Sequence, residues 1–447
     1  MVNPLALNGL LTSLKKKTTT PLLKSINACF DWLDDDNLIP KEPLIDAPPS
    51  PVFFSGGRKL ISFSSNNYLG MSRRPEVIKT AKKALSEYTM GTCESRKLGG
   101  NIALLEALEE KIARFKGEEA AMIFATGLLA NVATIPGLMD AEWYCNKFYG
   151  KKWSQESGTI FSDALNHRSI QMGIRLSHAN VVKYRHGDMA HLEQELANCK
   201  SSNKLIVSDG VFSMDGDLAP LPKLTKLASQ YQATVMIDDA HGTGIFGKNG
   251  RGVAEHFGVE NQVSIHMGTL SKAVGAMGGF VATDRKIIEF LKSTASGYRF
   301  TSSLPAEQAA GIICALEIMQ KEPQLRQKLW RNVSQLLMGL HELNIPIKKQ
   351  WSPIIPLFLG SAKKAYKAEK ILLELGLSCI AVVPPLVENN CSRLRITINS
   401  THTKEQIEQL LAGLKIVEKN IGFNMTDKSK QSWEEFKVTT PSYIIKT

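Results

Sequence analysis

The chain has 447 residues, of which 43% are hydrophobic and 22% are charged, so it is long enough for a large domain and a smaller one with separate cores. The formal net charge is +11, but the lysines are spread along the sequence without interleaved aromatic residues, so we expect phosphate, carboxylate or coenzyme A ligands and no nucleic acid. No apolar run approaches the ~20 residues of a membrane span, and no signal-peptide core, Cys-x-x-Cys pair or His-Glu-x-x-His motif occurs, which favours a cytoplasmic protein without a metal site.

The N-terminal part is the least informative about function. We expect an arm over residues 1–59, with a helix near Leu5–Lys16 and a proline-bearing stretch at Pro48–Pro51. A strand at Lys59–Ser64 follows, and apolar residues at three-and-four spacing then predict helices over Glu76–Glu87 and Ile102–Lys116.

From residue 120 onward, short apolar runs alternate with helical segments, which predicts a mostly parallel sheet covered by helices. Five of these runs end in chemically distinctive residues. In such sheets ligands lie outside the carboxyl ends of the strands, so we expect these residues to meet at one edge. The predicted strands are 121–125, 158–161, 204–207, 234–237 and 263–267, and the residues that follow them are, in order, Gly127, His167, Ser213, Asp238 with His241, and Lys272.

These residue types suit one cofactor. Gly127 and Leu128 begin a predicted helix, so their amides can hold a phosphate at the positive end of the helix dipole, although neither a P-loop nor a dinucleotide motif is present. A buried Asp238 can keep a pyridine nitrogen protonated, and Lys272, among small residues, can form a Schiff base with an aldehyde. Phosphate, pyridinium and aldehyde together indicate pyridoxal 5′-phosphate.

Three further positions complete this hypothesis. His167 can stack on the cofactor ring, and Ser213 and His241 can donate hydrogen bonds to its phenolate or to a substrate. Each residue taken singly has an ordinary structural explanation, as a turn glycine, a satisfied histidine or a helix cap. Their occurrence at the ends of five successive strands favours a shared site.

Several longer motifs resemble the α-oxoamine synthases, the pyridoxal-phosphate enzymes of aminotransferase fold type I that condense an amino acid with an acyl thioester. The match runs from about residue 60 to 415. The motifs are Asn66-x-Tyr-Leu-Gly70, Ser162-Asp-Ala-Leu-Asn-His167, Asp209-Gly-Val-Phe-Ser-Met-Asp-Gly216, Asp238-Asp-Ala-His-Gly-Thr-Gly244, Gly250-Arg-Gly252 and Gly268-Thr-Leu-Ser-Lys272. The resemblance implies an α/β fold, with a mostly parallel sheet in a large domain at 60–310, a smaller α+β domain at 311–423 and a tail at 424–447.

The resemblance also implies a role for each matched position. Lys272 would be the Schiff-base lysine and the base at Cα, Asp238 the partner of the pyridine nitrogen and His167 the stacking residue, with Ser213 and His241 near the phenolate oxygen. Thr269 and the amides of Gly127 and Leu128 would hold the phosphate. The segment Tyr298–Pro305 resembles one through which a neighbouring subunit touches the phosphate, implying a homodimer with shared active sites and a contact from Thr301.

For the substrates, the resemblance implies that Asn66 and Arg395 contact the amino acid, the arginine gripping its carboxylate. Arg96 would meet an acyl carboxylate or nothing. In the C-terminal part we expect a long helix through Leu316–Leu343, a helix over Ala362–Leu375 and the strand Arg393–Thr397.

Departures from the family pattern leave the substrates open. The Arg-Pro-Pro-Thr pattern common in 8-amino-7-oxononanoate synthases appears as Val383-Pro-Pro-Leu386, and residues 141–157 form an aromatic and basic insertion that most relatives lack. Different motifs resemble these synthases, glycine C-acetyltransferases and serine palmitoyltransferases, and the sequence does not separate the three. We expect the oxononanoate type, with the other two as alternatives. The resemblance implies that the acyl donor is a thioester of coenzyme A or of a carrier protein. A fold-type-I aminotransferase and a non-catalytic partner subunit are the more distant alternatives.

Overall fold

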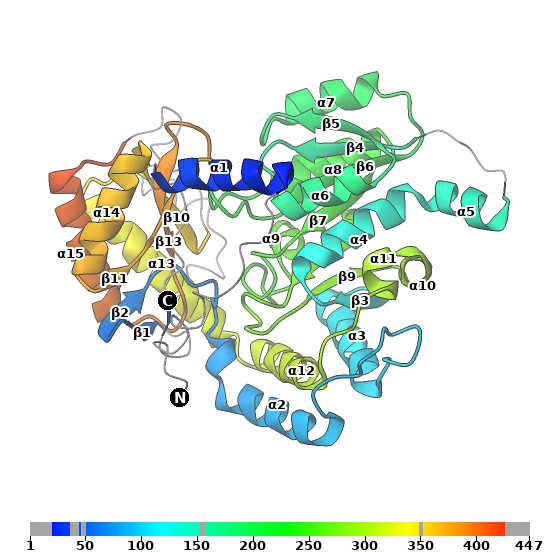
Figure 1. The fold of residues 1–447 in the computed structure, drawn as a ribbon, viewed down its shortest axis with the longest axis horizontal. Coiled ribbons are helices and arrows are strands. Elements are labelled where there is room, and N and C mark those ends of the chain that lie inside the picture. The colour runs from blue at the N-terminus through cyan, green and yellow to red at the C-terminus, as the bar shows by residue number, and fades with distance from the viewer. Residues whose placement is uncertain (1–19, 36–43, 46–50, 152–156, 348–351, 425–447) are drawn as a thin grey trace.

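The computed structural model describes residues 20–35, 44–45, 51–151, 157–347 and 352–424; the expected helix at Leu5–Lys16 and residues 425–447 of the tail lie outside them. The central element is a seven-stranded sheet in the order β3-β9-β8-β7-β6-β4-β5 (Figure 1). Only β9 runs antiparallel to its neighbours, so the expected mostly parallel sheet is confirmed. The strands are β3 (Ala120–Phe124), β4 (Thr159–Asp163), β5 (Asn180–Tyr184), β6 (Lys204–Asp209), β7 (Thr234–Asp238), β8 (Ile265–Thr269) and β9 (Gly279–Thr283).

The inner strands are buried along almost their whole length because helices cover both faces of the sheet. The helices of the described residues are α1 (Pro21–Asp35), α2 (Pro75–Tyr88), α3 (Ala103–Lys116), α4 (Gly127–Met139), α5 (Ala141–Tyr149), α6 (Arg168–Leu176), α7 (Met189–Asn198), α8 (Leu221–Gln230), α9 (Val253–Phe257), α10 (Arg285–Thr294), α11 (Ser296–Arg299), α12 (Ala306–Lys321), α13 (Gln324–Glu342), α14 (Ala362–Glu374) and α15 (Lys404–Asn420), with short 3₁₀ turns η3 (Met71–Arg73) and η4 (Glu260–Gln262). Met122 and Met236 point to one face of the sheet and pack with α4, α6 and α10, whereas Ile123 and Ile237, one residue along, pack on the other face with α3, α7, α8 and α12.

A second group of elements carries two small sheets and lies to the left in Figure 1. One sheet joins β10 (Ile354–Gly360), β13 (Ser392–Thr397) and β12 (Ile380–Val382) in antiparallel pairs. The other joins the hairpin β1 (Val52–Ser55) and β2 (Arg58–Ser62) to β11 (Leu377–Ser378). The expected boundary between residues 59 and 60 therefore falls inside β2, and the N-terminal hairpin is part of a sheet with C-terminal residues.

The single helix expected over Leu316–Leu343 is wrong. The chain forms α12 and α13 instead, and Glu322 between them takes φ −118° and ψ 66°, outside the helical region. Pro323 is the cause, since proline has no amide hydrogen and disfavours the helical conformation in the residue before it. The expected insertion at 141–157 begins with α5, while its residues 152–156 lie outside the described part of the chain.

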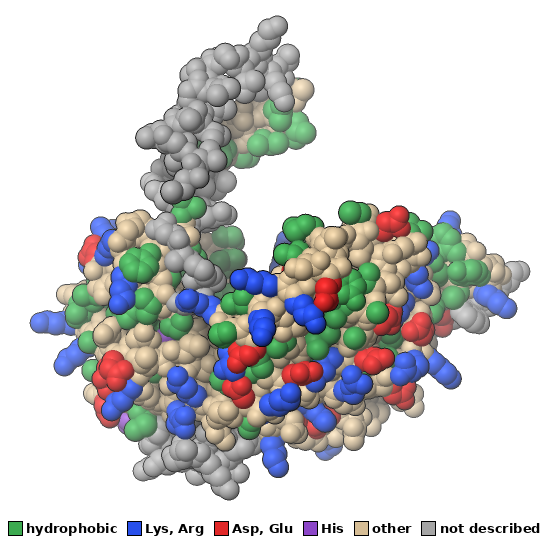
Figure 2. Space-filling view, turned by 90° about the horizontal axis from the view of Figure 1, so that it is seen from below, with side chains coloured by type: hydrophobic (Ala, Val, Ile, Leu, Met, Phe, Trp, Pro, Cys, Tyr) green, Lys and Arg blue, Asp and Glu red, His purple; other side chains and the backbone are tan. Residues whose placement is uncertain are grey.

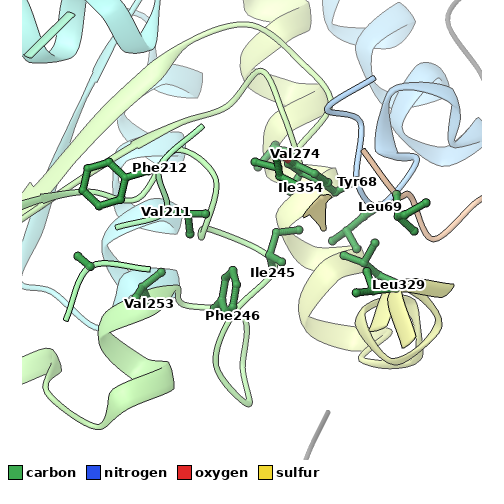
Figure 3. Close-up of a cluster of buried hydrophobic side chains, with 14 of the residues drawn as sticks. Tyr68, Leu69, Val211, Phe212, Ile245, Phe246, Val253, Val274, Leu329 and Ile354 are labelled. Carbon is green, nitrogen blue, oxygen red and sulfur yellow. The ribbon is translucent and has the colours of Figure 1, made fainter. Parts of the chain in front are cut away.

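One apolar cluster connects the two groups of elements. Figure 3 shows Val211 and Phe246 of the large sheet's loops in the same cluster as Leu329 of α13 and Ile354 of β10, with Tyr68 beside them. On the face shown in Figure 2, basic side chains are interspersed with acidic and apolar ones. Among the described residues, no helix is both long and apolar enough to cross a membrane.

Candidate active site

The carboxyl ends of the parallel strands surround a cavity of about 230 Å³. It is lined by eight residues predicted from the sequence, namely Gly127, Leu128, His167, Ser213, Asp238, His241, Thr269 and Lys272. Parallel strands bring residues that are far apart in the chain to the same edge, and this geometry explains the convergence.

One end of the cavity is formed by the first turn of α4. The side chain of Thr126 accepts a hydrogen bond from the amide of Leu129 (3.1 Å), which caps the helix. The amides of Gly127 and Leu128 have no partner within the helix and are oriented as anion donors. A Cβ atom on Gly127 would lie 3.0 Å from the side chain of Thr269, so only glycine fits without displacing that threonine.

Two buried carboxylates lie side by side at the ends of β6 and β7. Asp238 accepts hydrogen bonds from Asn131 Nδ2 (2.7 Å) and from the amide of Ala240 (3.0 Å), and Asp209 is its partner across the two strands. Burial, followed by the negative charge of Asp238, raises the pKa of Asp209 well above its usual range. Two adjacent buried carboxylates therefore disfavour a negative charge on both at once.

Lys272 follows β8 in a loop closed by hydrogen bonds from Leu270 N to Gly278 O (2.9 Å) and from Ala276 N to Leu270 O (3.0 Å). Burial lowers the pKa of the Lys272 ammonium to about 8, against the opposing charges of Asp238 and Asp209. About one tenth of this side chain is therefore a neutral, nucleophilic amine at pH 7, far more than for an ordinary lysine.

The ring of His167 is held by its neighbours at the start of α6. Its Nδ1 accepts a hydrogen bond from the amide of Ser169 (3.2 Å), and its own backbone amide donates to Asp209 Oδ2 (2.8 Å). Burial lowers the pKa of His167. A neutral ring with a fixed orientation is suited to stacking against a flat, electron-poor ligand.

His241 contacts the buried Tyr68, whose hydroxyl lies 2.7 Å from His241 Nδ1. Burial raises the pKa of Tyr68 to about 12 and, with the charges of Lys272 and Arg395, lowers the pKa of His241 well below its usual range. A neutral tyrosine and a neutral histidine therefore share one hydrogen bond here, and the tyrosine hydroxyl also lies 3.4 Å from Asn66 Oδ1.

Arg395 of β13 lies next to the cavity and connects it to the C-terminal part of the chain. Its Nε donates to the carbonyl of Ser213 (2.6 Å), its Nη atoms lie 3.3 Å from Asn66 Oδ1, and Nη1 donates to Thr397 Oγ1 (3.0 Å). Its charge contributes to lowering the pKa values of both Lys272 and His241. A guanidinium this close to Lys272 is a suitable partner for a substrate carboxylate.

Four predicted residues do not line the cavity: Asn66 and Arg395 contact each other beside it, whereas Arg96 and Thr301 have other surroundings. Arg96 is buried and pairs with Glu106 Oε1 (2.9 Å) and with Glu109, and its guanidinium lies 5.4 Å from the ring centre of Tyr298. Thr301 is half-buried and donates to the carbonyl of Ser302. The structure therefore separates Arg96 and Thr301 from the other predicted residues within one chain, and the ion pairs of Arg96 favour an internal role for it.

Sequence reasoning missed several residues of the site. Asp209, Ser169 and Ser271 also line the cavity, and Asn131 and Tyr68 orient its acid and its histidine. Asp209 was available from the pattern, because it ends a predicted strand at the same edge. Asn131 and Tyr68 come from a helix and a loop, where no periodic signal marks them.

The residues present fit pyridoxal 5′-phosphate. The amides at the start of α4 and Thr269 suit a phosphate, the carboxyl group of Asp238 suits a protonated pyridine nitrogen, and the amine of Lys272 suits an aldehyde. All of these groups line one cavity, and the neutral ring of His167 lines it with them.

Comparisons with known proteins agree with this chemistry. Residues 58–414 match the family model of class I and II aminotransferases. The chain is 39% identical over 391 residues to the 8-amino-7-oxononanoate synthase of Lysinibacillus sphaericus, covering 87% of this chain and 97% of that protein. It is 38% identical over 360 residues to the serine palmitoyltransferase of Bacteroides ovatus, covering 80% and 88%.

A solved structure of SPT with the PLP internal aldimine superimposes with a TM-score of 0.83 and 29% identity, covering 90% of this chain and 100% of that one. The fold, the cavity and these relatives lead to one assignment. The chain belongs to the class I and II aminotransferase family and, within it, to the pyridoxal-phosphate-dependent α-oxoamine synthases, which are acyltransferases.

Proposed function

We propose that this protein condenses a small amino acid with an acyl thioester, releasing CO2 and the free thiol, to give an α-amino ketone in the manner of the 8-amino-7-oxononanoate synthases. The observation that carries the proposal is the placement of Lys272, with its lowered pKa, in one cavity with Asp238 and next to Arg395. Two relatives that carry the name 8-amino-7-oxononanoate synthase, at 39% and 40% identity, support the oxononanoate-type product.

In this proposal each residue has a defined task. The amides of Gly127 and Leu128 and the hydroxyl of Thr269 bind the cofactor phosphate, and His167 packs on the ring face. Asp238 keeps a proton on the pyridine nitrogen. The chemistry supplied by the bound cofactor is the withdrawal of electrons from the bonds around the substrate α-carbon.

Lys272 is the proton carrier of the reaction. Its neutral Nζ removes the proton from the α-carbon of the amino acid, and the resulting ammonium returns a proton after CO2 has left. A pKa near 8 suits both tasks at neutral pH. Arg395, assisted by Asn66, binds and orients the substrate carboxylate, and His241 donates from Nε2 to the phenolate oxygen of the cofactor, beside Ser213.

A serine palmitoyltransferase activity is the second candidate, supported by the Bacteroides ovatus relative and by the similarity to the SPT structure. To distinguish these activities, glycine, alanine or serine is added to the cofactor-loaded protein. The change in cofactor absorbance shows which amino acid binds. Acyl thioesters of increasing chain length, on coenzyme A and on a carrier protein, then identify the acyl donor from the release of free thiol and CO2.

The function is tested by Lys272→Ala. We expect the variant to lose both the long-wavelength absorbance of the bound cofactor and turnover, whereas Lys286→Ala, which replaces an exposed lysine of α10, keeps both. A Lys272→Ala protein that retained its absorbance and activity would remove the assignment.

The proposal includes a homodimer in which Thr301 reaches the phosphate of the neighbouring subunit. Thr301 lies outside its own chain's cavity, and the neighbouring Phe300 is 76% exposed, as expected for a residue covered by a second copy. Light scattering of the purified protein tests the state of assembly. A mixture of inactive Lys272→Ala and Thr301→Glu chains regains part of the activity if sites are shared. We also propose a cytoplasmic location. All seven cysteines are free thiols, which supports a reducing compartment.

A further inference from the structure

His186 contacts two loops, each of which carries one residue that lines the cavity. It belongs to the turn that joins β5 to α7. Its Nδ1 lies 2.9 Å from Asp163 Oδ1, and its Nε2 lies 2.6 Å from Asp217 Oδ2. One imidazole ring therefore joins two acidic side chains from different parts of the chain.

The first of these acids begins the loop that leads to His167. Asp163 is the last residue of β4, and it also accepts hydrogen bonds from the amides of Leu165 (2.8 Å) and Gly187 (3.0 Å). The loop from Asp163 to His167 is thus fixed at its start by the same carboxylate that contacts His186.

The second acid closes the loop that carries Ser213. This loop, residues 210–219, is held together by hydrogen bonds from Phe212 N to Asp217 O (2.8 Å) and from Ala219 N to Gly210 O (3.0 Å). The side-chain contact of Asp217 with His186 connects the base of the loop to the edge of the large sheet. Ser213 lies near the tip and lines the cavity.

The geometry defines the charge state of His186. An ionised carboxylate only accepts hydrogen bonds, so two carboxylates on the two ring nitrogens require both nitrogens to be donors. Burial alone would lower the pKa of His186, but hydrogen bonds and charges from Asp163 and Asp217 raise it to about 10. The other near neighbours are the edge-on ring of Phe212, with centroids 4.5 Å apart, and Arg185 and Asp188 of the same turn, which pair with each other.

We propose that His186 is a positioning residue, which as an imidazolium holds the loops of His167 and Ser213 at the correct spacing around the cofactor. The inference rests on the proposed function, because His167 and Ser213 contact the cofactor in that proposal. The side chain is 26% exposed, so it acts from the rim of the fold and a glutamine in its place has room to be accommodated.

The test compares His186→Gln with wild type. Cofactor-free protein is titrated with pyridoxal 5′-phosphate, and absorbance and the circular dichroism of the bound cofactor are recorded. We expect His186→Gln to bind the cofactor about tenfold more weakly and with a smaller dichroic signal per bound molecule, because both flanking loops shift. The control is His341→Gln, an exposed histidine of α13, which should match wild type in both measurements.

Asp217→Asn provides a second route if His186→Gln does not fold. It keeps the histidine but removes one carboxylate, and it should shift affinity and dichroism in the same direction. The double variant, with both His186→Gln and Asp217→Asn, should bind the cofactor no more weakly than the single variant with the lower affinity. A lower melting temperature with unchanged affinity and dichroism would overturn the positioning role, as would additive losses in the double variant. Wild-type protein that fails to bind the cofactor would instead overturn the proposed function.

Discussion

At the scale of single residues, the lowered pKa of Lys272 predicts how its reactivity depends on pH. Its pKa in the folded protein is about 8, against an ordinary 10.5, so the neutral amine dominates above pH 8. In cofactor-free protein, the rate of reaction with pyridoxal 5′-phosphate should rise about tenfold per pH unit below 8 and then level off. Stopped-flow absorbance measures this rate. A rate that keeps rising beyond pH 10 would contradict the lowered pKa.

The same shift affects stability. Because the folded pKa lies below that of the unfolded chain, the unfolded chain binds more protons between pH 8 and pH 10.5, and Lys272 makes folding more favourable as the pH rises through this interval. Between pH 8 and pH 10.5, the free energy of unfolding of the cofactor-free wild type should rise by roughly 3 kcal/mol more than that of Lys272→Met. Denaturant unfolding of both proteins at both pH values measures this.

Arg395 supplies a prediction about shape rather than charge. Arg395→Lys keeps the positive charge but loses the forked guanidinium that contacts both Asn66 and the carbonyl of Ser213. We expect KM for the amino acid to rise by about 10- to 100-fold, corresponding to ~1.4–2.8 kcal/mol, with a smaller change in kcat. Steady-state kinetics measure both values. Arg331→Lys, at an exposed position of α13, is the matched control and should leave them unchanged.

At the scale of elements, the loop that carries Lys272 depends on Gly275. This glycine has φ +74°, and a Cβ atom there would overlap the backbone amide of Ser72. Gly275→Ala should therefore lower the free energy of unfolding by more than the ~1 kcal/mol expected from the backbone conformation alone, and should weaken cofactor binding. Gly258→Ala, at φ +67° with no atom within 4 Å, isolates the conformational cost. Equal losses in the two variants, measured by denaturant unfolding, would show that the contact with Ser72 is unimportant.

Sequence patterns predicted the elements that are buried and periodic. The expected helices at 76–87 and 102–116 match α2 and α3 within a residue, and the five strands of the site are each found within two residues. The edge strand β5 was not expected, because it is largely exposed and lacks an apolar run. The break between α12 and α13 depends on Pro323, whose effect was outweighed by continuous helical periodicity on either side.

At the scale of the whole molecule, the sequence did not predict which elements far apart in the chain contact one another. The residues at the strand ends predicted the site, because parallel strands place their carboxyl ends at the same edge whatever their order. No local signal places β11 beside β2, or Arg395 beside Ser213, because such contacts depend on how separate elements dock. The same holds for Arg96, where a polar loop residue proved to be buried in ion pairs with α3.

A buried ion pair, Arg393 with Asp215, connects the C-terminal part of the chain to a loop of the large sheet. Arg393 Nη1 donates to Asp215 Oδ1 (2.8 Å) and to the carbonyl of Met214 (3.3 Å), and its guanidinium lies 4.4 Å from the ring centre of Phe358. Asp215 belongs to the Ser213 loop, and Arg393 lies two residues before Arg395 on β13. This buried pair therefore holds the carboxylate-binding arginine against the rest of the site.

Removing one member of the pair of Arg393 and Asp215 should lower the free energy of unfolding more than removing both members. Asp215→Asn leaves the buried charge of Arg393 without its counterion, so we expect the free energy of unfolding to fall by roughly 3 kcal/mol and KM for the amino acid to rise. Adding Arg393→Met removes the uncompensated charge and should restore part of the stability, whereas KM should stay high because β13 is no longer held against the Ser213 loop. Denaturant unfolding and kinetics of both single variants and the double variant measure this coupling. Additive stability losses would mean that the two halves are held together by their apolar cluster alone.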